Sequence, residues 1–99
     1  MTFYKHKITS VQDLIPYAQN SRTHSDEQVA QLAGAIREFG FTNPVLIDEN
    51  HNLIAGHGRV LAARKLKMDT LPAIVVTGLD DRKRRALVIA DNKLALNAD

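Results

Sequence analysis

The chain has 99 residues, of which 44% are hydrophobic and 24% charged, and its formal net charge is +2. This length predicts one domain, and the absence of cysteine excludes disulfides, zinc–thiolate sites and a cysteine nucleophile. No stretch approaches the roughly 18 apolar residues of a membrane span, and no apolar signal segment follows the first residues, so we expect a cytoplasmic protein without membrane partners.

The first predicted elements are a strand and a short helical turn. Residues 4–8 alternate weakly in polarity, which predicts a strand at the edge of a sheet. Ser10 to Asp13 has the form of a capping box and predicts one helical turn over residues 11–14, which Pro16 then ends.

A polar loop and a long helix are expected next. Residues 17–24 are polar and predict the loop. Ser25 and Gln28 form a second capping box, after which apolar residues recur at helical spacing up to residue 39. Gly40 fits the left-handed position that commonly follows the end of a helix.

The middle of the chain predicts a hairpin followed by a helix. Residues 44–47 and 53–55 are short apolar strands, and the polar residues 48–52 form the turn between them. The glycines of Gly56-His57-Gly58 break the second strand, and helical spacing then continues to about residue 67.

The last third predicts a buried strand and a final helix. Residues 71–77 are rich in β-branched side chains, and Asp80 or Asp81 is placed to cap a helix in which Asp91-Asn92 marks an end or a kink. We therefore expect an α/β fold in an α+β layout, with a small mixed β-sheet and three main helices. Because little sign of a terminating cap precedes residue 99, this single domain (residues 1–99) is expected to be the front part of a longer protein.

The glycine turn is the first candidate for binding chemistry. Gly56, Gly58 and the following helix start would direct backbone amides and the positive end of a helix dipole at one point, to which Arg59 adds a guanidinium. This combination suits a phosphate; the alternative is a tight turn with a surface arginine. His57 could donate to a phosphate, act as an acid or base, or face solvent, and we assign it no proton-transfer role.

Three further stretches carry polar groups of interest. Arg22, beside Asn20, would complete an anion site or belong to a solvated loop. Asn92, beside Asp91, offers a hard oxygen ligand for Mg²⁺, or it lies at an ordinary helix end. Four consecutive cations point in all directions around a helix, which favours a solvated face over a DNA-binding patch; these candidate DNA contacts are Arg82, Lys83, Arg84 and Arg85.

Together these stretches resemble the N-terminal domain of the ParB family, which has the ParB/sulfiredoxin-like fold. The matching segments occur in the family's order and cover nearly the whole chain: residues 8–16, Asn20-Ser21-Arg22, the capped helix with Asn43-Pro44-Val45 after it, the turn and helix of residues 54–66, and Ile89-Ala90-Asp91-Asn92. The amino-acid sequence of the turn looks most like that of ParB-like domains in phage and prophage proteins. Such domains often lie in front of a DNA methyltransferase domain.

The resemblance implies a nucleoside triphosphate, CTP or ATP, bound with Mg²⁺. By that resemblance Arg22 and residues 56–59 (Gly56, His57, Gly58 and Arg59) would bind phosphate, and Asn92 would bind the metal or phosphate. Partition proteins usually have Glu and then Arg where this chain has His57 and Gly58, so one guanidinium is lost. Sulfiredoxin chemistry needs a cysteine in this turn, and the chain has none.

Our hypothesis is a nucleotide- or phosphate-binding module of a DNA-associated protein. One alternative is an NTP- or ADP-dependent kinase or nucleotide hydrolase that uses the same pocket. The other is a direct DNA-binding or nuclease domain, although the sequence shows no carboxylate cluster suited to two metals. The expected partners are a nucleotide and DNA, contacted directly or through a further domain; a homodimer is compatible with the sequence.

Overall fold

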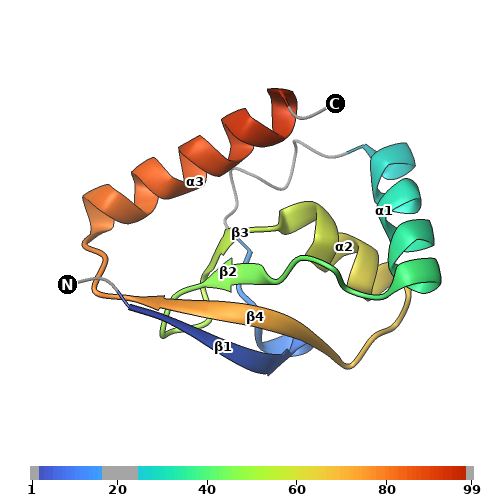
Figure 1. Cartoon of the computed structure of the whole chain (residues 1–99), viewed down its shortest axis with the longest axis horizontal. Helices are drawn as coiled ribbons and strands as arrows, with labels where there is room; N and C mark the ends of the chain where they lie inside the picture. Colours follow the sequence, from blue (N-terminus) through green and yellow to red (C-terminus); the bar gives the residue numbers. More distant parts are fainter. Residues whose placement is uncertain (1–2, 17–24, 98–99) are drawn as a thin grey trace.

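The computed structural model describes residues 3–16 and 25–97, with side chains up to residue 90 (Figure 1). Its elements in chain order are β1 (Phe3–Ser10), the short 3₁₀ helix η1 (Val11–Asp13), α1 (Asp26–Phe39), β2 (Val45–Ile47), β3 (Leu53–Ala55), α2 (His57–Lys65), β4 (Thr70–Thr77) and α3 (Asp81–Asn97). The expected mixed sheet with three main helices is confirmed.

The four strands form one sheet in the order β1-β4-β2-β3. β1 pairs antiparallel with β4 along its whole length, from Phe3 opposite Thr77 to Ser10 opposite Thr70. β4 runs parallel to β2, and β2 and β3 form the predicted antiparallel hairpin. β1 is therefore an edge strand, as its weak alternation predicted.

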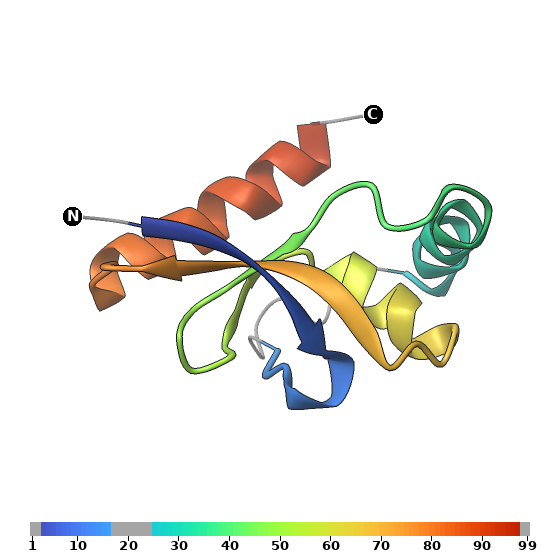
Figure 2. The same cartoon turned by 60° about the horizontal axis from the view of Figure 1, so that its bottom comes forward.

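The sheet has a core on each face. On one face, apolar side chains of β2, β3 and β4 pack against α2 and η1, with Val45, Val60 and Ala63 almost fully buried. On the other face, Val88 of α3 packs with Ile54 and Val76. Figures 1 and 2 show α1 beside α2 at one end of the molecule, while α3 runs separately from them.

Local hydrogen bonds explain where two helices begin. The Ser25 hydroxyl accepts from the amide of Gln28 at 3.1 Å, and the Gln28 side chain accepts from the Ser25 amide at 3.1 Å, so the predicted capping box is present. The Asp80 carboxylate accepts from the amide of Lys83 at 2.7 Å and caps α3. Gly40 has the expected positive φ of 80°, but its ψ of −173° places it outside the left-handed helical region.

Two local predictions are wrong. Ser10 makes no side-chain capping bond at η1; instead the amide of Val11 donates to the carbonyl of Asp69 at 3.0 Å, so a long-range bond replaces the local one. Asp91 and Asn92 neither end nor kink the last helix, because α3 continues through them to Asn97. A short polar pair costs a helix less than about 1 kcal/mol per residue, which is too little to end it.

Candidate functional site

The predicted strand, glycine turn and helix are all present. Gly56 lies between β3 and α2 with φ 99° and ψ 27°, a left-handed conformation that side chains disfavour. A Cβ atom at this position would lie 2.7 Å from Cγ1 of Val45 and 3.0 Å from Nη2 of Arg59. Glycine is thus required twice, once for its backbone angle and once because β2 packs directly against the turn.

The start of α2 points its amides away from the helix body. The first helical hydrogen bond runs from the amide of Val60 to the carbonyl of Gly56 at 3.0 Å. The amides of residues 57–59 therefore precede the intrahelical ladder, at the positive end of the helix dipole. This is the arrangement that the glycine spacing predicted.

The glycine turn lies inside the protein. His57 is only 5% exposed, and Gly56 and Gly58 are also buried. The sequence left three roles open for His57, and the one in which its side chain faces solvent is therefore wrong. The sequence pattern did not show this burial, because a histidine at a helix start has no periodic partner that assigns it to a face.

Arg59 is half-buried and held against the start of β2. Its Nη2 donates to the carbonyl of Pro44 at 3.2 Å. The side chain also lines a hollow of about 190 Å³, whose other walls come from the end of α1 and the segment after it: Leu32, Ala35, Ile36, Phe39, Gly40, Phe41, Thr42 and Asn43. The hydrogen bond to Pro44 holds the guanidinium beside the turn.

The structure brings together only part of the predicted site. Gly56, His57, Gly58 and Arg59 are contiguous in the turn. Arg22 lies outside the described residues, and Asn92 belongs to α3 but its side chain is outside the described part. The convergence of these two residues on the turn remains a prediction.

The four cations of α3 are not equivalent. Arg82, Lys83 and Arg85 are exposed. The side chain of Arg84 is only 27% exposed, and its Nη1 lies 3.3 Å from Oδ2 of Asp48. Arg84 therefore ties α3 to the β2–β3 turn, and a DNA contact remains a prediction for its three exposed neighbours.

Asp48 is a buried residue that the sequence analysis missed. Its side chain is 1% exposed and accepts three hydrogen bonds: from the amide of Asn50 at 2.8 Å, from the amide of Asn52 at 2.8 Å and from the Asn52 side chain at 3.0 Å. A carboxylate that bonds amides two and four positions later is typical of an Asx-type turn. The Asp-x-Asn-x-Asn spacing after a strand was the available signal.

Among the described side chains, those of residues 3–16 and 25–90, no group of three or more His, Asp or Glu is placed to hold a metal ion. No helix in this same part of the chain has the length and apolar character needed to cross a membrane.

The four-stranded mixed sheet and its helices place the structure in the ParB/sulfiredoxin-like class of folds, as its similarity to two solved structures shows. The structure is similar to that of C-terminally truncated chromosome-partitioning protein ParB from Caulobacter crescentus complexed with CTP-γ-S, with a TM-score of 0.78, 25% identity, and coverage of 89% of this chain and 52% of that one. Sulfiredoxin from Arabidopsis thaliana shares the fold alone, with a TM-score of 0.70, 19% identity, and coverage of 84% and 97%.

The ParB N-terminal domain profile matches residues 5–93, and the chain belongs to this family. It is 61% identical over 75 residues to the ParB-like nuclease domain-containing protein YnaK of Escherichia coli K12. The matched region covers 76% of this chain and 86% of YnaK. It is also 38% identical over 80 residues to the probable chromosome-partitioning protein ParB of Helicobacter pylori, covering 78% of this chain but 27% of that protein. The chain thus spans about a quarter of the length of this partition protein.

Proposed function

We propose that this domain binds a nucleoside triphosphate, with CTP as the first candidate, at the start of α2. The observation that carries the proposal is the fixed turn from Gly56 to Arg59, which places helix-start amides and a half-buried guanidinium side by side. Such a group of donors suits an anion with several oxygens. The similarity to a ParB complexed with CTP-γ-S supports a nucleotide as that anion.

In this proposal the amides of residues 57–59, which follow Gly56 at the start of α2, and the Arg59 guanidinium bind phosphate, with Arg22 as a further phosphate ligand. Asn92 binds Mg²⁺ or a phosphate oxygen. Each charge-assisted hydrogen bond contributes about 1.5–3 kcal/mol. Micromolar affinity corresponds to about 8 kcal/mol, so three or four such bonds are needed once the costs of binding are included.

The sequence of the turn affects the expected strength of binding. Where partition proteins resembling this chain usually supply Glu and Arg, this chain has His57 and Gly58. The buried His57 contributes at most one hydrogen bond to a phosphate, so we expect weaker binding than a turn with two guanidinium groups would give.

Calorimetric titration with CTP, ATP, GTP and ADP, each with and without Mg²⁺, tests the proposal. We expect saturable binding that Arg59→Ala weakens at least tenfold, in keeping with a bond of about 1.5–3 kcal/mol. Arg37→Ala is the matched control, because Arg37 is an exposed arginine in the last turn of α1. Arg59→Lys is included because a lysine can still donate to Pro44 but lacks the planar fork.

Two results would contradict the proposal. One is the absence of saturable binding by all four nucleotides. The other is equal binding by the Arg59→Ala and Arg37→Ala proteins when thermal melts show that both are folded. Analysis of the nucleotide after incubation tests the enzymatic alternatives, because loss of the terminal phosphoryl group would leave a diphosphate from a triphosphate and a monophosphate from ADP.

Direct DNA contact is the second candidate function, because Arg82, Lys83 and Arg85 are exposed together at the start of α3. Binding of duplex DNA through these side chains would weaken steeply with salt, with a slope of about 0.9 in log K for each phosphate contact. Changing the three residues to glutamate should flatten this slope. If the salt dependence of log K does not change, any DNA contact involves another surface or another domain.

A further inference from the structure

β1 leaves one long edge of the sheet open to a partner. Its eight residues pair with β4 on one side, and no strand among residues 3–16 and 25–97 pairs with the other side. Every residue from Phe3 to Ile8 is exposed. Native proteins commonly protect such edges with prolines, bulges, short strands or charged side chains. β1 contains no proline and its register with β4 is uninterrupted, so its protection against unspecific pairing comes from Lys5 and Lys7.

The two faces of this edge differ in chemistry. Side chains alternate along a strand, so Lys5 and Lys7 project with Phe3 from one face, and Tyr4, His6 and Ile8 project from the other. Tyr4 and Ile8 are 66% and 67% exposed. The edge thus has a cationic side and an apolar side, and β1 contains no acidic residue.

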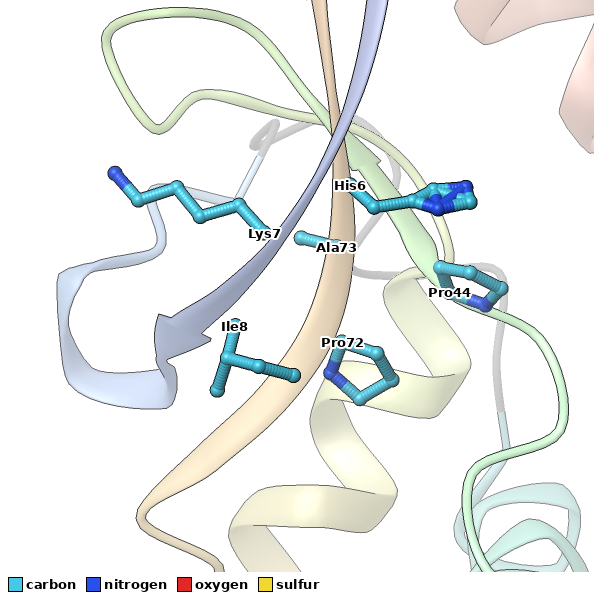
Figure 3. A pocket seen from close by; sticks show the side chains of 6 residues that line it. All are labelled: His6, Lys7, Ile8, Pro44, Pro72 and Ala73. Atoms are coloured by element: carbon cyan, nitrogen blue, oxygen red, sulfur yellow. The ribbon is translucent and has the colours of Figure 1, made fainter.

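Hollows adjoin both faces of the edge. On the cationic side, Phe3, Lys5 and Lys7 border a hollow of about 530 Å³, which Asp48 and Glu49 of the β2–β3 turn also line. On the apolar side, a hollow of about 210 Å³ lies between β1 and the prolines Pro44 and Pro72. Figure 3 shows His6 directed toward Pro44, while Lys7 points to the opposite side of the strand.

Charge decides which kind of strand suits this edge. Lys5 and Lys7 form no ion pair with a described residue, since both recorded ion pairs involve Arg84. Pairing β1 with the β1 of a second copy would bring lysines close to lysines, and like charges across a strand pair are destabilising. A strand with carboxylates on the lysine side would instead form cross-strand ion pairs.

We propose that the β1 edge binds an extended partner segment in which acidic and apolar residues alternate. Its backbone adds a fifth strand to the sheet, its acidic side chains face Lys5 and Lys7, and its apolar side chains lie against Tyr4 and Ile8. In strand addition, main-chain hydrogen bonds supply affinity and alternate side chains supply specificity. A one-residue slip would place the acids on the apolar side, so the alternation also fixes the register.

Fluorescence anisotropy with a labelled, end-blocked octapeptide of four glutamates alternating with four valines tests this inference. The control peptide has the same composition, with all four glutamates before the four valines. We expect the alternating peptide to bind at least tenfold more tightly, and we expect hydrogen exchange of the β1 amides to slow when it binds.

A charge reversal tests the role of the lysines. Lys5→Glu/Lys7→Glu should weaken binding of the glutamate peptide at least tenfold and create binding of an alternating lysine–valine peptide. The matched control is Arg37→Glu/Lys65→Glu, which makes the same change in net charge at exposed positions of α1 and α2. This control should change binding less than twofold.

Several outcomes would overturn the inference. Equal binding of the two glutamate peptides would show attraction by charge without strand pairing. Equal binding by the charge-reversed and wild-type proteins would exclude the lysines. Sedimentation that shows a dimer dependent on β1 would assign the edge to a second copy, and displacement of the peptide by a single-stranded oligonucleotide would assign it to nucleic acid.

Discussion

Replacing Asp48 by alanine tests whether a single buried carboxylate holds both the β2–β3 turn and α3. The side chain of Asp48 is 1% exposed and accepts three hydrogen bonds within the turn, while its Oδ2 also pairs with Arg84 at 3.3 Å. The substitution removes all four interactions at once. It leaves the amides of Asn50 and Asn52 without their acceptor in a partly buried position.

The magnitude follows from these contacts. Each partly buried amide that loses its acceptor costs about 1–3 kcal/mol, and the ion pair adds about 1 kcal/mol because Arg84 is still partly in contact with water. We therefore expect Asp48→Ala to lower the free energy of unfolding by about 3–7 kcal/mol. Arg84→Ala should cost only about 1–2 kcal/mol, because the three hydrogen bonds to the Asp48 carboxylate remain.

Urea denaturation followed by circular dichroism measures both values, together with the Asp48→Ala/Arg84→Ala double variant. Because Arg84 acts through Asp48, the double variant should be little less stable than Asp48→Ala alone, which corresponds to a coupling of about 1 kcal/mol. A loss below 1 kcal/mol for Asp48→Ala would refute the reasoning. If the losses in the free energy of unfolding of the two single variants add up to that of the double variant, the ion pair between Arg84 and Asp48 does not anchor α3.

Three further predictions concern glycines and helix caps. Gly56→Ala should cost about 2–5 kcal/mol in urea denaturation, since the new Cβ needs a positive φ and would lie 2.7 Å from Cγ1 of Val45; a loss below 1 kcal/mol would show that β2 yields easily. Gly34 lies in α1, and a Cβ added there meets nothing within 4 Å, so Gly34→Ala should instead raise the stability by about 0.5–1 kcal/mol; a decrease would show that the added methyl group is not accommodated. Ser25→Ala and Asp80→Ala should each cost about 1 kcal/mol through loss of a helix cap, and unchanged midpoints would show that water replaces these side chains at little cost.

Elements specified by neighbouring residues were predictable from the sequence. The capping box at Ser25, the cap at Asp80 and the turn at Gly56 each depend on residues within four positions, and each is present. The β2–β3 hairpin was predictable for the same reason, because a polar turn separates two short apolar strands.

Features that depend on distant residues were not predictable in this way. The amide of Val11 bonds to Asp69, which supersedes the expected role of Ser10. Arg84 looked like one of four equivalent cations, and only its contact with Asp48 distinguishes it. The burial of His57 likewise depends on how α2 packs between other elements.

The place of β1 in the sheet has a consequence for how the chain folds during synthesis. Ser10 pairs with Thr70 and Phe3 with Thr77, so β1 leaves the ribosome long before its partner strand exists. Pairing at such sequence separation is slow, because closing a long loop costs entropy before any contact compensates it. During this interval the nascent strand has neither edge covered. Lys5 and Lys7 then act as gatekeepers, whose charge opposes aggregation between neighbouring nascent chains until β4 emerges.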